Sequence, residues 1–432
     1  MNVFGILFTL ATSALLLRLP RNWAPLPLLL GAAYVTLVQQ LEIGPVHFSV
    51  TRLLIMVGLV RVMINGERVA GGMKSIDRMM ILWAIWDVCT LLFHKSDVFV
   101  FRLGLLYDTL GVYYLFRVFI RGLDDIQNVF KMMCILLLPL SATMLVERLQ
   151  GNNPLALFGF GSEGVLVTKG HFRAAGPFGH PILAGTVGAA CLPMALYLWR
   201  QNRKVAVVGL VAALCIVFAS GSSGPILTGF AMLAGLAVWK IRPHLRTIRW
   251  AVVLGIFTLN LAMNEPVYYL IARIDITGGS TGWYRAHLLQ YSFEHLEQWW
   301  LAGTDSTRGW TLVAINNSSS DITCHYLQMG VWGGLPLMFL FLTVLFSGFA
   351  EVGRGLKSHK SAPTKYQFLI WTVGCILFGH AIALMSVSYF DQSFVFLYLA
   401  LAMVAQANVA VISPAMISRN TPRSSPAISP AI

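Results

Sequence analysis

Charged residues are scarce in this chain. Asp, Glu, Lys and Arg together make up 11% of its 432 residues, whereas hydrophobic residues make up 57% and mean hydropathy is +0.70. Soluble domains usually carry about 25% charged residues, so this shortage excludes an ordinary soluble protein. The sequence instead predicts an all-α, polytopic integral membrane protein with the lipid bilayer as a partner, because repeated runs of about 20 apolar residues are typical of membrane-spanning helices.

Several chemical signatures are also missing. The chain has six cysteines but no C-x-x-C spacing, and all but Cys324 fall in apolar runs, which argues against disulfides and zinc sites. It has no D-x-D pair, Walker loop, HExxH or GxSxG motif. Nucleotide-sugar chemistry, NTP hydrolysis and zinc peptidase activity are therefore poorly supported, and we expect neither a metal nor a cofactor.

Acidic residues are fewer than basic ones, 18 against 31, which gives a formal net charge of +13. The basic residues are scattered through short hydrophilic gaps and are not gathered on a soluble domain. That pattern is typical of cytoplasmic loops that face anionic lipid, so we expect no nucleic-acid partner.

Apolar runs dominate the rest of the chain, and they predict about 13 membrane-spanning helices. Residues 1–412 then form a single transmembrane domain. The first run lacks a basic region before it and a clear cleavage signal, so we expect a retained span and not a signal peptide. The Ser- and Pro-rich tail 413–432 is expected to be disordered and cytoplasmic. The expected spans lie near 2–18, 24–40, 48–64, 79–94, 98–118, 129–147, 181–199, 204–220, 224–240, 247–264, 326–349, 366–386 and 391–412.

Lys and Arg gather in every second gap between the expected spans, which indicates that these gaps face the cytoplasm. The alternate gaps are poor in charge or mixed. They include two long loops, 148–180 and 264–325, and the short turn 220–225. These three segments are therefore predicted to face outward together.

The loop 148–180 ends in a cationic cluster of Lys169, His171, Arg173 and His180. The span that follows can begin at a proline, because proline is tolerated in a first helical turn. Positive charge is normally scarce on the outer side, so the cluster suggests an anionic ligand. The alternative is an interfacial turn with snorkelling cations.

The turn at 220–229 is rich in small residues. Ser222 and Ser223 stand at the expected start of a span, where free backbone amides can bind an anion. A tight turn that only lets helices pack closely is the alternative.

The loop 264–325 is the longest polar and aromatic interruption in the chain. We expect a helix over 283–303 that lies at the outer membrane surface and holds Arg285 near the lipid headgroups. An amphipathic re-entrant segment without chemistry is the alternative. The apolar stripe that predicts this helix consists of Ala286, Leu289, Phe293, Leu296 and Trp300.

Polar residues continue beyond the expected helix. Asp305 and Arg308 follow it, and His325 stands where the next span begins. A histidine there can exchange protons near neutral pH, or it can simply end a helix. Asp391, between the last two spans, can orient a cation in the site or cap the final helix.

Taken together, these segments resemble the O-antigen ligase and O-antigen polymerase superfamily. An Arg that precedes a Gly-Pro turn and a span matches residues 173–181, and a small-residue turn matches 221–224. An Arg that opens an aromatic segment matches 285–303, and a His that leads into a Gly-rich span matches 325–334. The resemblance covers roughly residues 140–410.

Two positions depart from the family pattern. Ser223 stands where Arg is frequent, so a third cationic contact lacks its residue there. Tyr326 stands where Asn is frequent, so an amide contact to sugar lacks its residue as well.

The resemblance implies a glycosyltransferase at the periplasmic face of the bacterial inner membrane, with a glycan on undecaprenyl diphosphate as donor. Arg173 and Arg285 would hold the diphosphate leaving group, because guanidinium groups bind it bidentately and stabilise the developing charge. His325 is the first candidate for the base, with Asp305, Asp321 or Glu294 as alternatives. Substrate contacts are expected from Lys169, His180, Ser222, Ser223, Asp305 and Arg308.

The acceptor distinguishes the two activities of the family. Another lipid-linked repeat unit gives a polymer, either exopolysaccharide or O-antigen, whereas a sugar of the lipid A core gives a ligated product. We favour the polymerase, which could act beside polysaccharide export or chain-length proteins, and keep the ligase as the alternative.

Two other classes stay open. A transporter or lipid-linked sugar flippase should show ionisable residues within spans, and Asp87, Asp108 and Glu147 are the best examples. A non-catalytic scaffold in polysaccharide export is the third hypothesis.

Overall fold

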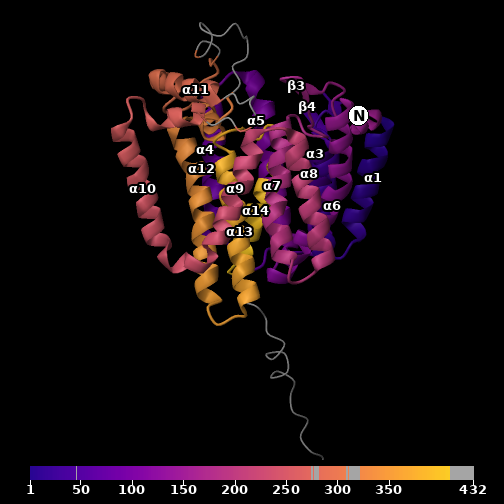
Figure 1. Cartoon of the computed structure of the whole chain (residues 1–432). Coiled ribbons are helices and arrows are strands. Elements are labelled where there is room, and N and C mark those ends of the chain that lie inside the picture. Colours follow the sequence, from indigo (N-terminus) through magenta and orange to yellow (C-terminus); the bar gives the residue numbers. More distant parts are fainter. Residues whose placement is uncertain (45, 274–275, 277–281, 308–309, 311–321, 409–432) are drawn as a thin grey trace, which may run out of the picture.

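The computed structural model describes residues 1–44, 46–273, 276, 282–307, 310 and 322–408. In this part of the chain the protein is a bundle of helices with two short β-hairpins (Figure 1). The all-α prediction is confirmed. The 3-10 turns are η1 (Arg21–Trp23), η2 (Leu91–Phe93), η3 (Pro154–Phe158), η4 (Val238–His244), η5 (Val267–Arg273) and η6 (Leu296–Gln298).

Each of the expected spans coincides with one α-helix. These helices are α1 (Val3–Arg18), α2 (Pro25–Tyr34), α3 (Val50–Asn65), α4 (Ser75–Thr90), α5 (Ser96–Phe119), α6 (Leu123–Gln150), α7 (Pro181–Leu198), α8 (Arg203–Ser220), α9 (Ser223–Ala237), α10 (Leu245–Ala262), α12 (His325–Ser358), α13 (Thr364–Ala383) and α14 (Phe394–Gln406). One further helix, α11 (Gly282–Glu294), lies in the loop 264–325.

Seven helical stretches among the described residues are long and apolar enough to cross a membrane, which supports a membrane protein. One of them joins α9, η4 and α10, and Figure 1 shows that the chain reverses between these two helices. The helices α1 and α14 are shorter apolar helices. The expected total of about 13 spans stays a prediction.

Side chains at the helix ends show why the spans begin where they do. Asn2, Ser49 and Asn202 each accept a hydrogen bond from a backbone N–H in the first turn of the helix that follows. Such caps satisfy donors that have no partner within the helix. At the other ends, α3 and α6 stop at Gly66 and Gly151, both in the left-handed conformation.

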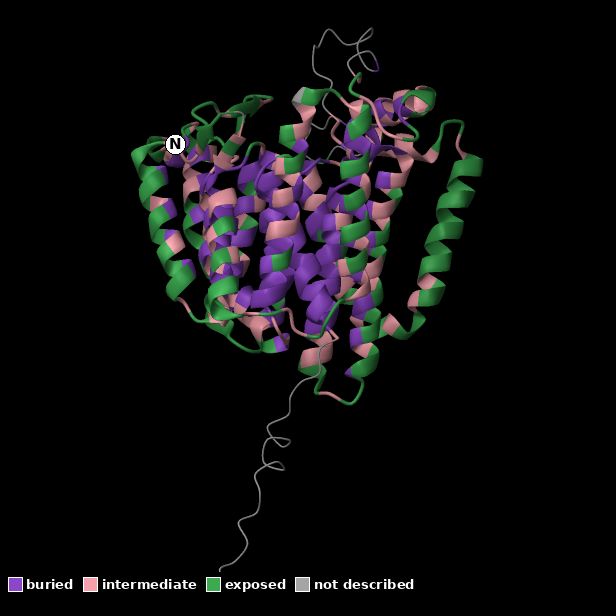
Figure 2. Ribbon diagram, turned by 180° about the vertical axis from the view of Figure 1, so that it is seen from behind, coloured by how far each residue is buried: buried purple, intermediate pink, exposed green. Residues whose placement is uncertain are grey.

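The core of the bundle is formed by α7 and α14, which are buried along nearly their whole length (Figure 2). α7 is rich in Gly and Ala on all sides, which lets its neighbours approach closely. In contrast, α10 has no buried residue and stands at the edge of the molecule in both views.

The described parts of both long loops lie at one end of the bundle, which we call the outer end (Figure 1). The hairpin of β3 (Leu166–Thr168) and β4 (His171–Arg173) lies there, with register Leu166 to Arg173, and so does α11. The hairpin of β1 (Gln40–Ile43) and β2 (Val46–Ser49) pairs Gln40 with Ser49. The turn between α12 and α13 lies at the opposite end.

The helix expected over 283–303 is shorter in the structure. α11 ends at Glu294, because Trp299 turns inward, packs against Gly330 and donates from Nε1 to the carbonyl oxygen of Ser292 at 2.9 Å. The buried face of α11 also differs from the expected stripe. It carries Ala286, Leu288 and Ser292, whereas Phe293 is exposed.

Candidate functional site

Arg173 ends strand β4 and reaches toward the turn between α8 and α9. Its Nη2 donates to Ser222 Oγ at 2.6 Å, and its Nε donates to the carbonyl oxygen of Ser220 at 3.4 Å. The backbone N–H of Ala174 donates to the carbonyl oxygen of Ala219 at 3.0 Å, which fixes the strand on the same turn. The two predicted segments 173–181 and 221–224 are therefore one structural unit.

Arg148, in the last turn of α6, joins this unit from the side. Its Nη1 donates to the carbonyl oxygen of Phe172, and its Cζ lies 5.8 Å from the Phe218 ring centroid. A Cβ on Gly221 would lie 3.0 Å from Nη1 of Arg148 and 3.3 Å from Cγ of Arg173. The two guanidinium-bearing side chains therefore lie side by side over the turn.

Arg285 comes to the same region from α11. Its Nε donates to the carbonyl oxygen of Ser386 at 2.9 Å, and Ser386 Oγ in turn lies 3.3 Å from the position that a Cβ on Gly224 would take. Burial lowers the pKa of Arg285, and the charge of Arg173 lowers it further. Arg173 likewise has a lowered pKa, through burial and then through the charge of Arg148.

His180 lies within the field of two of these arginines. It caps α7, with its Nδ1 accepting a hydrogen bond from the Ile182 N–H at 3.2 Å. Burial lowers its pKa to about 4, with added contributions from the charges of Arg173 and Arg285. The ring is therefore neutral at neutral pH. Because Nδ1 is the acceptor, its proton is on Nε2, which can donate to a ligand.

The three arginines differ from the paired arginines elsewhere in the part of the chain that the structure describes. Among the described residues, no carboxylate lies within salt-bridge distance of Arg148, Arg173 or Arg285. Partly buried cations that repel one another are costly unless an anion joins them. The arrangement therefore suits an anionic ligand. The paired arginines are Arg21 with Asp125, Arg52 with Asp108, Arg61 with Glu67, Arg102 with Asp87, Arg117 with Asp77 and Arg354 with Glu351.

The segment 384–393, between α13 and α14, holds the parts of the site together. Besides binding Arg285 through Ser386, it accepts the Gly179 N–H on Asp391 Oδ2 at 2.7 Å. Asp391 Oδ1 also accepts the Ser393 N–H at 2.8 Å. Asp391 therefore holds the turn before α7 and also binds the backbone just before α14. The sequence had suggested a cap on the final helix or a contact to a cation, but not the contact to Gly179.

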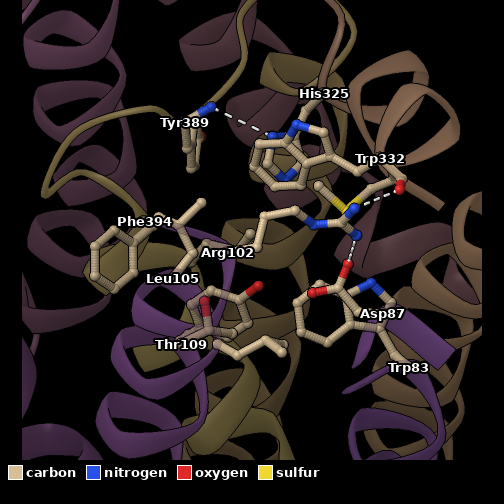
Figure 3. A pocket seen from close by; sticks show the side chains of 13 residues that line it. Trp83, Asp87, Arg102, Leu105, Thr109, His325, Trp332, Tyr389 and Phe394 are labelled. Carbon is tan, nitrogen blue, oxygen red and sulfur yellow. Dashed lines mark hydrogen bonds and ion pairs between the residues drawn. The ribbon is translucent and has the colours of Figure 1, made fainter. Parts of the chain in front are cut away.

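His325 begins α12 and contacts the same segment. Its backbone N–H donates to the Leu384 carbonyl oxygen at 2.9 Å, and the Tyr389 N–H donates to its Nδ1 at 3.4 Å. The ring is buried and lines a cavity together with Trp332, Arg102 and other residues (Figure 3). None of Arg148, Arg173 and Arg285 lines that cavity.

The remaining expected residues have separate surroundings. Lys169 is exposed at the tip of the β3–β4 hairpin, whereas Ser222 and Ser223 are buried, Ser222 in the turn before α9 and Ser223 as the first residue of α9. Asp305 binds His94 Nδ1 at 2.6 Å, so it lies with the loop between α4 and α5 and not with the arginines. Arg308 and Asp321 lie outside the described residues.

Sequence reasoning had not singled out Arg148 and Ser386. Arg148 carried a usable signal, because it opens the same outer loop whose cations had been noted. Ser386 acts through its backbone carbonyl, and no residue pattern reveals such a contact.

Comparison of the sequence with models of protein families and with curated proteins found no match in either case.

Proposed function

We propose that the protein is a glycosyltransferase that acts on undecaprenyl-diphosphate-linked glycan at the periplasmic face of the bacterial inner membrane. The observation that carries the proposal is the group of three arginines at the outer end that have no carboxylate partner in the part of the chain that the structure describes. A diphosphate is an anion that guanidinium groups hold well. The apolar helices of the bundle offer a surface for a polyprenyl chain.

In the proposed reaction, a hydroxyl oxygen of the acceptor attacks the anomeric carbon of the donor sugar. A new C–O bond forms while the bond from that carbon to the diphosphate oxygen breaks. The electron pair stays on the diphosphate, where Arg173 and Arg285 stabilise the charge. The neutral Nε2–H of His180 adds a hydrogen bond to the same anion without adding charge.

The proton of the attacking hydroxyl needs a base, and His325 stays our first candidate. Its Nδ1 accepts only a long hydrogen bond, 3.4 Å from Tyr389 N, which is weak. The ring can therefore change tautomer at small cost and leave a nitrogen free to take the proton. Glu294 remains an alternative within the described residues.

We favour the polymerase, in which the acceptor is another lipid-linked repeat unit, over the ligase, in which it is the lipid A core. A flippase or transporter is the less favoured alternative; of the charges raised for it, Asp87 and Asp108 are each paired with an arginine, and Glu147 accepts the Ala175 and Gly176 N–H groups.

The test uses a strain that lacks the gene and is complemented with variants. Arg173→Ala and Arg285→Ala should each lower long-chain glycan synthesis by roughly 100-fold, the cost of losing one group that stabilises transition-state charge. Arg200→Ala, at an exposed basic gap, is the matched control and should restore wild-type glycan. Glycan length is read from membrane extracts on gels. Full restoration by both outer-end variants would exclude the proposed role.

The same extracts separate the polymerase from the ligase. Deletion of an O-antigen polymerase should leave single repeat units attached to lipid A core, and deletion of an exopolysaccharide polymerase should leave single repeat units on undecaprenyl diphosphate. Deletion of a ligase should leave long glycan on undecaprenyl diphosphate. A deletion that changes none of these species would contradict both activities.

A further inference from the structure

Helix α12 is broken two turns after it begins. Gly333 and Gly334 have non-helical backbone angles, and Gly334 has a φ of 75°. A break of this kind leaves backbone carbonyl oxygens without helical partners, which is costly inside a membrane unless other groups donate to them. The carbonyl oxygens of Val331, Trp332 and Gly333 all receive donors from outside α12.

A segment of the outer loop, Trp300–Asp305, docks on this break. The Thr304 N–H donates to the Val331 carbonyl oxygen, and the Leu335 N–H donates to the Trp300 carbonyl oxygen, both at 2.8 Å. The approach is so close that a Cβ on Gly303 would lie 2.2 Å from the Val331 oxygen. The segment is therefore held to α12 by backbone contact.

His94, from the loop between α4 and α5, closes the junction. Its Nδ1 lies 2.6 Å from Asp305 Oδ1, and its Nε2 lies 2.8 Å from the Trp332 carbonyl oxygen and 3.0 Å from that of Ala302. The side chain is only 3% exposed. One ring thus contacts the docked segment and the break of α12 together.

Among the described residues, both nitrogens of His94 face only hydrogen-bond acceptors. A carboxylate and a backbone carbonyl cannot donate, and a neutral imidazole carries one N–H. All three contacts are hydrogen bonds only when both nitrogens carry a proton. In the neutral ring, one nitrogen lone pair has to face either the Asp305 carboxylate or the two carbonyl oxygens.

We propose that His94 and Asp305 form a proton-dependent clamp that holds the segment Trp300–Asp305 on the break in α12. With His94 doubly protonated, the ion pair and the two carbonyl contacts hold the segment closed. With His94 neutral, the hydrogen bond to Asp305 or the hydrogen bonds to the two carbonyl oxygens are lost. The segment then separates from α12 more often.

Other charged groups surround the clamp. Asp305 Oδ2 accepts the Lys95 N–H at 3.0 Å, so the carboxylate stays in place when His94 changes its charge. Arg102 Nη1 also donates to the Trp332 carbonyl oxygen, at 2.6 Å, and is paired with Asp87. The Trp332 carbonyl oxygen at the break therefore keeps the Arg102 donor whether His94 is charged or neutral. Only the contacts of the docked segment depend on the charge of His94.

The clamp bears on the arginine site through Trp299. This residue directly precedes the docked segment, and its side chain is anchored between Gly330 of α12 and Ser292 of α11. α11 carries Arg285. Release of the segment is therefore expected to loosen the position of Arg285, whatever reaction the site performs.

Hydrogen–deuterium exchange of the full-length protein in lipid nanodiscs tests the clamp. The readout is the exchange of peptides containing Thr304 and Leu335, corrected for the intrinsic effect of pH. Between about pH 5 and pH 8, where histidine changes its charge, wild-type exchange should rise. The expected rise is about tenfold, as for the loss of one charge-assisted hydrogen bond.

Three variants sharpen the result. His94→Gln should show fast exchange at every pH. Asp305→Asn leaves His94 in place, but its side-chain amide can donate to the neutral ring. This variant should therefore abolish the pH dependence. His47→Gln, an exposed histidine in β2, should keep the wild-type pH dependence. Exchange in the wild type that does not change with pH, or a pH dependence that survives in His94→Gln or Asp305→Asn, overturns the proposal. Because exchange needs no substrate, this result is independent of any glycosyltransferase assay.

Discussion

Arg148, Arg173 and Arg285 differ from the arginines inside the bundle in having no carboxylate beside them among the described residues. Arg52, inside the bundle, is neutralised by Asp108 at 3.0 Å, whereas Arg173 donates to the hydroxyl oxygens of Ser222 and Thr168 and to the backbone oxygen of Ser220, which are all neutral. A neutral oxygen shell orients a guanidinium group without cancelling its charge. The site thus keeps its positive potential available to a ligand.

His180 offers a pH test of this potential. Its pKa is lowered from 6.5 to about 4, so between these values the unfolded chain binds a proton that the folded chain does not. Stability is therefore full above pH 6.5 and falls as the pH falls toward 4. His180→Asn should flatten that part of the curve, because asparagine keeps the cap on Ile182 but does not titrate.

The measurement is thermal unfolding in detergent from pH 4 to pH 7 for the wild type and His180→Asn. Replacing the exposed His171 by Asn serves as the control and should leave the curve unchanged. Identical curves for the wild type and His180→Asn would show that His180 is not buried among like charges.

At this scale the sequence predicted part of the site. The order of motifs selected Arg173, Arg285 and Ser222, and the structure connects them through the turn before α9 and the segment 384–393. It could not place Asp305, because the partner of Asp305 is a histidine 211 positions away. Contacts over such sequence distances follow from helix packing, which a single sequence does not specify.

At the scale of elements, the broken α12 is the main departure from a plain bundle. The sequence predicted the span but not its break, since a Gly-Gly pair in an apolar run can equally allow two helices to pack closely. The break is stabilised by the docked segment Trp300–Asp305. This segment supplies a hydrogen-bond donor and an acceptor to the backbone groups of α12 that have no helical partner at the break.

Gly334→Ala tests the docking contact. A Cβ there would lie 2.2 Å from the Leu301 carbonyl oxygen, on a residue with positive φ. We expect the free energy of unfolding to fall by about 2 kcal/mol or more, from strain and the displaced segment.

Gly255→Ala is the matched control, because no heavy atom lies within 4 Å of its Cβ position on α10. Alanine favours a helix over glycine by about 1 kcal/mol, so this variant should be as stable as the wild type or more stable. Unfolding midpoints in detergent compare the two. Equal midpoints for Gly334→Ala and the wild type would show that the segment is not packed as described.

For the whole molecule, the all-α class was predictable because long apolar runs, interrupted by polar capping residues, proline or glycine, mark most of the helices. α2 is the clearest exception, since its run continues to residue 40 but the helix ends at Tyr34 and the chain turns into the β1–β2 hairpin. The β-hairpins have no strong pattern of their own and depend on the helices that flank them.

The orientation in the membrane is a prediction at this scale. Basic gaps indicate that the turn between α12 and α13 is cytoplasmic and that the β3–β4 loop faces outward. In a background with Cys89→Ser, we expect Ser162→Cys to react with a membrane-impermeant maleimide in intact cells. Ser361→Cys should react only after the cells are made permeable. The reverse pattern would invert the orientation and place the arginines in the cytoplasm.

The lone helix α10 has a consequence for how this chain can vary. Because none of its residues is buried by the protein, its apolar side chains have no closely packed partner whose shape they must match. Leu, Ile, Val and Phe are then interchangeable in its apolar stretch, where a charge would be costly, whereas its first turns carry Arg246 and Arg249. Two related chains can therefore differ at most positions of this helix and still share the arginine site, to which the chain continues from the outer end of α10.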